Sequence, residues 1–315
     1  MVQIERDENY INALTLFIYQ QYDIKATSIT SANRGYYGET WRIDTADKSF
    51  FLKLDYSEKH QIKYRNSLHI VDYLCNQGID FINRIVKTVQ GELFANFDKS
   101  ILCIFEWIDG KSIETDETKI PEYQMLAKIY SSSKQGFDIP AVMFSNDATD
   151  TFFAKWNKLK SNEGIEHNNI MNSIFDKHEK KLYFRAERLS YFANLCKTDY
   201  SHFYFTHGDA GGNILVTDEK YYIIDWDEVM YAPPERDAWV MSCREWAINA
   251  FNDSLNQNGI DYKLRNERIA FYCYHMFFQY LNELLNDFFL SGQTKEIEEY
   301  FDCWIEERIQ YADSL

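Results

Sequence analysis

A short β-rich segment, residues 203–225, interrupts a C-terminal region whose remaining sequence is helical in pattern, and this contrast constrains the fold most strongly. In it, HGDAGGN (207–213) follows a run of aromatic residues and precedes the β run NILVT. DEK then predicts a turn, and a last β run ends in IIDWD (223–227). Two β runs joined by a short polar turn predict a hairpin. The sequence therefore predicts a small hairpin, preceded by a glycine-bearing loop.

Polar residues gather at the strand ends of this hairpin. The prediction places Asp209, Asn213 and Asp225 close together, because the loop before the hairpin and the end of its last strand meet on one side. Carboxylate and amide oxygens are the hard ligands that Mg²⁺ and a bound triphosphate require. A His-x-Asp triplet in an arbitrary chain is usually a solvated turn, so the interpretation depends on both motifs occurring together.

The rest of the chain divides into a β-rich third and a helical body. Apolar residues at helical spacing, followed by Gly78, predict one N-terminal helix over 64–78. From about residue 120 the pattern is helical outside the β-rich segment. We therefore expect an α+β chain. The predicted N-terminal strands lie within 28–44 and at 49–56, 91–97 and 100–108.

Charge limits the possible partners. The formal net charge is −16, and residues 201–315 hold 21 acidic and 8 basic residues. Phosphate backbones require a basic surface, so we expect no nucleic-acid partner. The acidic excess suits a cationic substrate or bound Mg²⁺, although acids on solvated helix faces are the more common origin of such an excess.

We expect a cytoplasmic protein with no membrane partner. The start, MVQIERDENY, is charged and lacks the apolar region of a signal peptide. The most apolar stretch, 269–281, is too short and too polar for a membrane span. Six cysteines are scattered singly, without metal-ligand spacing, which indicates reduced thiols.

Four motifs occur in an order that resembles a known family. HGDAGGN and IIDWD, together with QMLAKIYSSS (124–133) and APPERDAW (232–239), resemble the aminoglycoside phosphotransferase and choline kinase family of the protein-kinase-like fold. The likeness covers essentially the whole chain and is strongest to spectinomycin-kinase-like members. It implies a bilobal α+β fold. Residues 1–105 would form an antiparallel-sheet, nucleotide-binding lobe, 106–110 a hinge, and 111–315 a larger helical catalytic and substrate-binding lobe.

The resemblance implies a role for each polar residue of the two central motifs. Asp209 would be the catalytic residue that orients the acceptor hydroxyl and accepts its proton. Asn213 and Asp225 would hold Mg²⁺ between the nucleotide phosphates. Asp227 is a second acid beside that site, with metal and substrate as alternative partners. The structural residues would be His207 and Asp237, which brace the loop by hydrogen bonds.

The same resemblance implies a nucleotide site in the N-terminal third. Lys53, in FLKLDY, matches the third-strand lysine that contacts the α- and β-phosphates. Gly35 and Gly38 would let backbone N–H groups approach the nucleotide. In FEWIDG (105–110), backbone atoms of Glu106 and Ile108 would pair with the purine edge. The donor would be ATP or GTP.

Three departures from the family pattern stand out. The Asp209–Asn213 loop is one residue shorter than usual, and positive φ at Gly211 and Gly212 would allow the tighter turn. The segment GYYG (35–38) holds only two glycines. No acid occupies residues 67–69, where the helix glutamate that pairs with the lysine is expected. The candidate substitutes are Glu58, Asp72 or the phosphates alone.

The short stretch 226–232 leaves no room for the activation segment on which protein kinases dock a peptide. We therefore expect a small-molecule acceptor and no protein substrate. Three hypotheses follow. The first is an O-phosphotransferase for an aminoglycoside- or aminocyclitol-like compound, with Asp227, Glu245 or Asp253 facing its cationic groups. The second is a metabolic kinase for choline, ethanolamine, homoserine or a methylthio sugar. The third is a catalytically silent nucleotide-binding scaffold.

Overall fold

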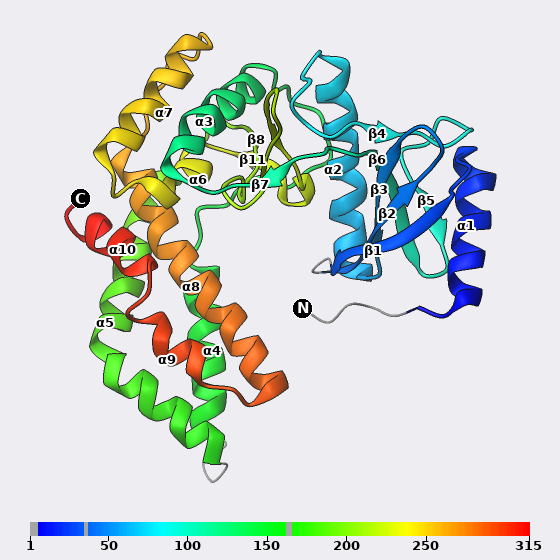
Figure 1. The fold of residues 1–315 in the computed structure, drawn as a ribbon. Helices are drawn as coiled ribbons and strands as arrows, with labels where there is room; N and C mark the ends of the chain where they lie inside the picture. The colour runs from blue at the N-terminus through cyan, green and yellow to red at the C-terminus, as the bar shows by residue number, and fades with distance from the viewer. Residues whose placement is uncertain (1–5, 35–36, 162–165) are drawn as a thin grey trace. The chain divides into compact units, whose positions relative to one another are not determined.

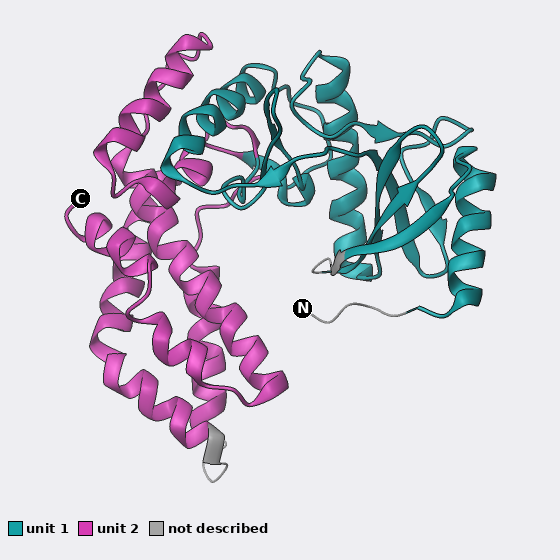
Figure 2. Cartoon of the chain, viewed as in Figure 1, with its two compact units in different colours: residues 1–140, 207–231 teal, residues 141–206, 232–315 magenta. Residues whose placement is uncertain are grey.

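The computed structural model describes residues 6–34, 37–161 and 166–315, and these form two compact units (Figures 1 and 2). Unit 1 contains residues 1–140 and 207–231, and unit 2 contains residues 141–206 and 232–315. The predicted β-rich segment therefore belongs, from residue 207 onward, to the same unit as the N-terminal sheet. The finer division into two lobes at a hinge over 106–110 stays a prediction.

Unit 1 carries the six-stranded sheet, the three-stranded sheet and three long helices. Its elements, in chain order, are α1 (Glu8–Tyr22), β1 (Ser28–Arg34), β2 (Gly38–Asp44), β3 (Ser49–Asp55), α2 (Glu58–Asn76), β4 (Ile85–Val86), β5 (Ala95–Phe97), β6 (Ser100–Glu106), β7 (Lys111–Ser112), α3 (Asp116–Ser131), β9 (Ile214–Val216), β10 (Tyr221–Ile223) and the 3₁₀ turn η1 (Trp226–Glu228), followed by β11 (Met230–Ala232), which ends at the unit boundary.

The large sheet of unit 1 is antiparallel and has the strand order β1-β2-β3-β6-β4, with β5 also paired to β6. In β3, side chains alternate between the two faces. Phe50, Leu52 and Leu54 are buried in one core with α1, whereas Lys53 points to the other face, where α2 lies (Figure 1). The predicted α+β class with an N-terminal antiparallel sheet is confirmed.

Helix α1 was not predicted, so the expectation of a single helix in the N-terminal third was wrong. Asp7 accepts a hydrogen bond from the amide of Tyr10 and caps the helix. Leu14, Ile18 and Tyr22, four residues apart, form its buried stripe. The second helix, α2, begins at Glu58, six residues before the predicted start.

The predicted hairpin is present as β9 and β10, and β7 adds a third strand. Ile214 pairs with Ile223, and the amide of Ile224 donates to the carbonyl of Asn213 at 3.0 Å. The loop that precedes β9 and the segment that follows β10 are therefore held side by side. This register brings the two motifs together.

Unit 2 is helical apart from one short strand. Its elements are α4 (Asp147–Ser161), α5 (Glu166–Cys196), β8 (Tyr204–Thr206), α6 (Glu235–Ala238), the 3₁₀ turn η2 (Trp239–Met241), α7 (Glu245–Gln257), α8 (Asn266–Ser291), α9 (Lys295–Tyr300) and α10 (Ile305–Asp313).

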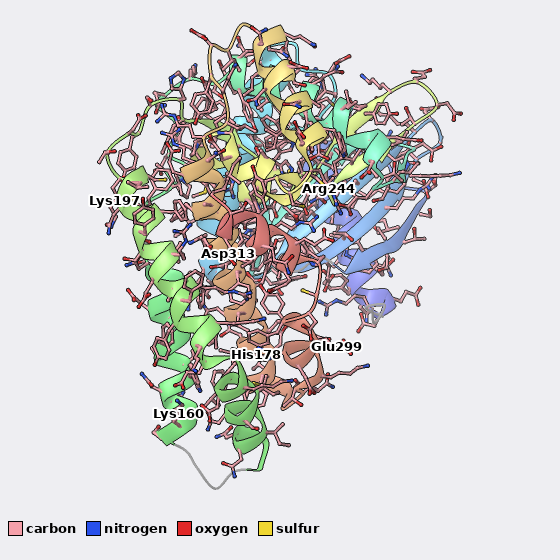
Figure 3. The ribbon with its side chains drawn as sticks, turned by 90° about the vertical axis from the view of Figure 1, so that its left-hand side faces the viewer. Lys160, His178, Lys197, Arg244, Glu299 and Asp313 are labelled. Carbon is pink, nitrogen blue, oxygen red and sulfur yellow. The ribbon has the colours of Figure 1, made fainter. Side chains whose placement is uncertain are left out.

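The core of unit 2 is aromatic. The ring of Phe152 on α4 lies 5.2 Å from that of Phe175 on α5 and 5.6 Å from that of Phe278 on α8. Charged side chains such as Arg244 and Glu299 lie on the outside (Figure 3). Within the described parts of the chain, none of the helices combines the length and apolar character that crossing a membrane requires.

A buried carboxyl group joins α6 to the start of α8 in unit 2. Oε1 of Glu235 accepts hydrogen bonds from the hydroxyl of Tyr262 and the amide of Arg265, both at 2.6 Å. Glu235 is fully buried, and its Oε2 has no partner among the described residues. Burial raises the pKa of Glu235 to about 7, against the opposing effect of the Tyr262 hydroxyl.

The raised pKa of Glu235 makes folding sensitive to pH. Because the folded protein holds the proton up to about pH 7 and the unfolded chain releases it near 4.5, stability falls as pH rises through this window. Glu235→Gln keeps an oxygen acceptor and cannot ionise. We expect the variant to gain up to about 3 kcal/mol relative to wild type between pH 5 and pH 8. Urea unfolding of both proteins across this range measures the difference, and a pH-independent difference would contradict the assignment.

Candidate active site

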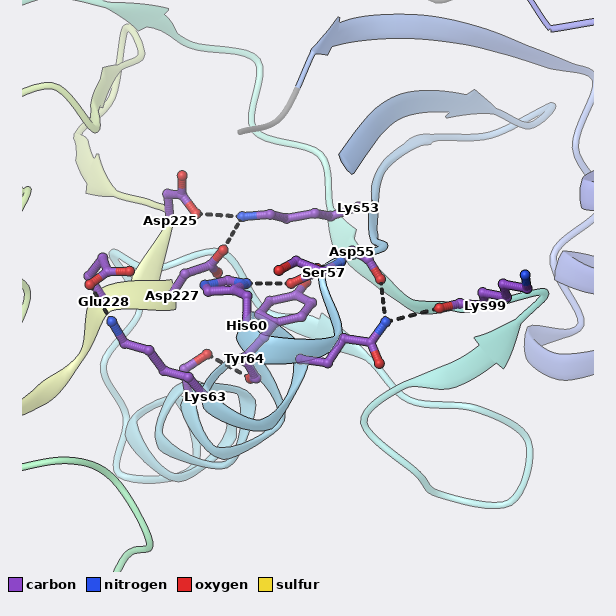
Figure 4. Close-up of polar contacts among 12 residues, drawn as sticks. Lys53, Asp55, Ser57, His60, Lys63, Tyr64, Lys99, Asp225, Asp227 and Glu228 are labelled. Carbon is purple, nitrogen blue, oxygen red and sulfur yellow. Dashed lines mark hydrogen bonds and ion pairs between the residues drawn. The ribbon is translucent and has the colours of Figure 1, made fainter. Parts of the chain in front are cut away.

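Lys53 of β3 binds two carboxylates of the segment that follows β10 (Figure 4). Its ammonium group lies 2.7 Å from Oδ1 of Asp225 and also forms an ion pair with Oδ2 of Asp227. Burial by itself lowers the pKa of Lys53, but the charges of Asp227 and Asp225 outweigh it and raise that pKa above its ordinary value. The three side chains form one charge cluster.

The two acids differ in environment. Asp225 has a φ of 62°, a left-handed conformation that is uncommon outside glycine and is often found at functional sites. Although burial opposes it, Lys53 lowers the pKa of Asp225. For Asp227, burial and the charge of Asp225 win over the attraction of Lys53 and raise the pKa to about 6. Asp225 therefore loses its proton more readily than Asp227 does.

His207 connects the two motifs from inside the unit. Its ring is fully buried, and Nε2 lies 2.9 Å from the carbonyl oxygen of Ile224 while Nδ1 lies 3.2 Å from the amide nitrogen of Asp209. A carbonyl accepts and an amide donates, so Nε2 carries the hydrogen and Nδ1 is the acceptor. The indole of Trp226 packs against the ring edge to face at 4.6 Å. These contacts fit the bracing role predicted for His207.

Asp209 and Asn213 lie together despite the shortened loop. The side-chain nitrogen of Asn213 lies 2.7 Å from the carbonyl oxygen and 3.1 Å from Oδ2 of Asp209. This leaves the amide oxygen of Asn213 as a potential ligand. The pKa of Asp209 is raised by burial, with the charge of Asp225 adding to the shift and His207 opposing it. A raised pKa makes a carboxylate a better proton acceptor.

The loop closes in a way that the sequence analysis did not anticipate. Neither Gly211 nor Gly212 has a positive φ; the left-handed glycine of this loop is Gly208, with a φ of 85°. The expected positive φ at the two adjacent glycines was therefore wrong. The turn closes through a hydrogen bond of 2.9 Å from the amide of Asn213 to the carbonyl of Ala210.

Gly211 lies close to a side chain of α3. A Cβ atom at Gly211 would lie 2.8 Å from Nζ of Lys119. Lys119 is buried and forms an ion pair of 3.0 Å with Glu122 on the same helix. At Gly212, an added Cβ atom would meet nothing within 4 Å.

The predicted nucleotide-loop glycines have different outcomes. Gly35 lies outside the described residues. Gly38 begins β2 opposite Asp55, and a Cβ atom there would lie 1.8 Å from the carbonyl oxygen of Leu54. The close packing of β2 on β3 is thus a sufficient reason for glycine at this position. Backbone donation to a nucleotide by Gly38 stays a prediction.

At the predicted hinge, the amide of Glu106 is already used, because it donates to the carbonyl of Arg84 at 2.9 Å. Ile108 follows in the loop after β6. A hollow of about 330 Å³ opens nearby, lined by Arg42, Lys48, Ser49, Phe50, Glu106, Trp107 and Asp109. This hollow includes none of the predicted phosphate- or metal-binding residues, so we do not assign it to the nucleotide. The hinge roles of Glu106 and Ile108 stay predictions.

Neither proposed substitute for the missing helix glutamate contacts Lys53. Asp72 pairs instead with Lys87 at 2.9 Å, and Glu58 is exposed at the start of α2. Helix α2 contributes instead a basic and an aromatic side chain, neither of which was predicted from the sequence. Lys63 forms an ion pair with Glu228, and the ring of Tyr64 lies 5.3 Å from the ammonium group of Lys53.

Asp237, the other predicted bracing residue, lies in α6 of unit 2 and is largely buried. Its amide donates to the carbonyl of Pro234 at 3.0 Å. Its bracing role stays a prediction.

The acids suggested for binding a cationic acceptor lie in different environments. Glu245 and Asp253 are exposed on α7, whereas Asp227 forms an ion pair with Lys53.

The donor set fits magnesium bound together with phosphates. Over residues 6–34, 37–161 and 166–315, no three His, Cys, Asp or Glu side chains form a ready-made metal site. Mg²⁺ is typically held by one or two protein oxygens and completes its shell with phosphates and water. The carboxylate of Asp225 and the amide oxygen of Asn213 are ligands of this kind. Mg²⁺ at Asp225 would compete with Lys53, whose ammonium group holds one of its two carboxylate oxygens.

A strand lysine facing two acids after a hairpin, with an Asp and an Asn in the preceding loop, is the arrangement of kinase-like phosphotransferases. Residues 28–270 match the phosphotransferase enzyme family, and the chain belongs to that family. The predicted family and the enzyme class, a small-molecule phosphotransferase, are thereby confirmed.

Solved structures with the same fold include three of different substrate classes. A spectinomycin phosphotransferase, solved with ADP and spectinomycin, has a TM-score of 0.80 at 18% identity, over 96% of this chain and 98% of that one. An aminoglycoside phosphotransferase from Alicyclobacillus acidocaldarius has a TM-score of 0.71 at 13% identity, over 99% and 96%. A choline kinase from Streptococcus pneumoniae has a TM-score of 0.59 at 14% identity, over 98% and 100%. At these identities the likeness establishes the fold.

The two adjacent glycines of the loop offer a matched pair of variants. Gly211→Ala pushes a methyl group against the buried Lys119, and we expect it to lower the free energy of unfolding by about 1–3 kcal/mol. Gly212→Ala meets open space, and its effect should stay within about 0.5 kcal/mol. Urea unfolding of both variants and wild type makes the comparison. Equal effects would show that the close approach of Gly211 to α3 is not a constraint.

Proposed function

We propose that this protein transfers the γ-phosphoryl group of ATP or GTP, with Mg²⁺, to a hydroxyl of a small amine-bearing acceptor of the aminoglycoside or aminocyclitol class. The observation that carries the proposal is the joint position of Asp209, Asn213, Asp225 and Lys53 in one unit, tied together by Lys53 and His207. Phosphoryl transfer needs mainly positioning and charge neutralisation, and these four side chains supply both.

Each residue has one task in the proposed reaction. Asp209 aligns the acceptor hydroxyl and accepts its proton, which its raised pKa favours. Asp225 and Asn213 hold Mg²⁺, which supplies charge neutralisation at the phosphates. Lys53 binds the phosphates after it leaves Asp225. His207 keeps the amide of Asp209 and the carbonyl of Ile224 at a fixed separation.

A small acceptor suits the segment after Asp225. Residues 226–228 form η1, and β11 begins at Met230. The amide of Tyr231 donates to the carbonyl of Pro140 at 2.8 Å. This short, hydrogen-bonded path holds no platform for a peptide. The antibiotic-kinase class is favoured over a metabolic kinase by the fold likeness, because the spectinomycin phosphotransferase aligns at a TM-score of 0.80 and the choline kinase at 0.59.

Substitution of the catalytic aspartate tests the chemistry. Asp209→Asn keeps the shape and removes the base, so we expect turnover to fall at least about a hundredfold with the fold intact. The measurement is acceptor-stimulated release of nucleoside diphosphate from ATP or GTP with Mg²⁺. The acceptors are aminoglycosides, spectinomycin, choline, ethanolamine, homoserine and methylthioribose. Asp218→Asn, exposed in the hairpin turn, is the matched control and should be unchanged.

The outcome also decides between acceptor classes. Stimulation by choline, ethanolamine, homoserine or methylthioribose in place of the antibiotics would favour the metabolic kinase. Near-wild-type turnover by Asp209→Asn would remove Asp209 from the mechanism. Nucleotide binding without transfer to any acceptor would favour the silent scaffold.

The metal role of Asp225 predicts a change in magnesium dependence. Asp225→Asn removes one anionic ligand, so we expect the Mg²⁺ concentration for half-maximal turnover to rise at least about tenfold. A magnesium titration of turnover at saturating nucleotide measures it. An unchanged magnesium requirement would show that the ion is held elsewhere.

A further inference from the structure

In the contact between α2 and the segment 225–228, the positions of the acidic and basic side chains are reversed relative to the kinase pattern. There, an acid on the helix holds the strand lysine. Here Lys53 takes its acids from the segment 225–228, and α2 directs basic side chains, His60 and Lys63, toward the acids of that same segment (Figure 4). The link between helix and segment is therefore made by different pairs.

The ring of His60 is fixed on three sides. It is buried, and its Nδ1 is hydrogen-bonded to the carboxylate of Asp55, which is itself fully buried. The ring of Tyr37 stacks on it at a centroid distance of 3.7 Å and an angle of 16°. On α2, the ring of Tyr64 lies nearly parallel to it at 6.1 Å. The direction in which its other nitrogen, Nε2, points is thus set by the surrounding side chains.

Nε2 of His60 is buried and has no hydrogen-bond partner among the described residues. An unpaired buried polar atom costs free energy, and in native structures it calls for an explanation. The nearby carboxyl group is that of Asp227, which lies next to His60 in Figure 4. In the structure described, Asp227 uses Lys53 as its partner.

In the proposed function, nucleotide binding draws Lys53 away from Asp227. When the phosphates attract Lys53, Asp227 loses the cation that compensates its burial, and only 13% of its side chain is exposed to water. A buried carboxylate left without a partner is strongly destabilising. Nε2 of His60, which is buried and unpaired among the described residues, is available to share a hydrogen with this carboxyl group. The orphaned nitrogen thus becomes useful at the step where Asp227 is released.

We propose that His60 is a positioning residue that binds Asp227 through Nε2 when Lys53 turns to the nucleotide phosphates. The His60–Asp227 pair then holds α2 against the segment 225–228 and takes the place of the missing helix glutamate. This inference rests on the proposed function, because it requires Mg²⁺ and nucleotide to draw Lys53 and Asp225 apart.

Two substitutions at His60 separate its two nitrogens. In His60→Asn, the shorter amide keeps a donor near Nδ1 for Asp55 and removes the group at Nε2. In His60→Gln, the longer amide reaches the place of Nε2 and gives up the contact with Asp55. The same substitution at the exposed His69 of α2, His69→Asn, is the matched control.

The measurement is the dissociation constant of the full chain for the imido analogue of ATP or GTP with Mg²⁺, by titration calorimetry. We expect His60→Asn to weaken binding about tenfold, His60→Gln to stay within about threefold, and His69→Asn to equal wild type. Asp227→Asn alone should weaken binding of the analogue, and it should cause little further loss when combined with His60→Asn, because the two residues act as one pair. Wild-type binding by His60→Asn, or a larger loss in His60→Gln, would reduce His60 to a support for Asp55 and overturn the inference.

A second readout uses the wild-type protein, so it does not depend on the folding of a variant. Nitrogen-15 NMR of the histidine side chains should show Nε2 of His60 gaining a hydrogen bond when the magnesium–analogue complex is added. An unchanged Nε2 signal in the bound protein would overturn the inference while leaving the proposed function intact. Absence of nucleotide binding by wild type would overturn both.

Discussion

The ammonium group of Lys53 is shared by Asp225 and Asp227, and the rest of the site is arranged around this sharing. None of the three charges is independent: burial alone would make Lys53 a weaker base and Asp227 a weaker acid. Their mutual attraction offsets part of that cost, and loss of Lys53 would leave the largely buried Asp227 without its cation. The charge of Lys53 is thus balanced by side chains of the site itself. In the function that we propose, magnesium and the nucleotide phosphates would take the places of these partners.

The hydrogen bonds of His207 do not involve Lys53. Because its ring accepts from the amide of Asp209 and donates to the carbonyl of Ile224, the loop and the strand end stay joined whether or not Lys53 moves. Helix α2 is also joined to this segment without Lys53, because Lys63 of α2 is paired with Glu228. The proposed function therefore requires a change of partners among side chains and leaves the hydrogen bonds of His207 to the backbone in place.

What the sequence could predict here was governed by local pattern. The hairpin followed from alternating β runs and a polar turn, and Asn213 and Asp225 were placed together because the strand register carries them there. Helix α1 was not predicted, although Leu14, Ile18 and Tyr22 recur at helical spacing. The partners of Lys53 lie more than 170 positions away in the sequence. No spacing rule within α2 contains that information, so the helix-based substitutes were wrong.

Helix α1 has a practical consequence for anyone trimming this chain. The match to the phosphotransferase family begins at residue 28, after α1 has ended at Tyr22. Yet Leu14 and Ile18 close the core against Leu52 and Ile104 of the sheet. A fragment cut at the family boundary would present the apolar face of β3 and β6 to water, which is a surface prone to self-association. The region that defines the family is thus shorter than the region that keeps its sheet covered.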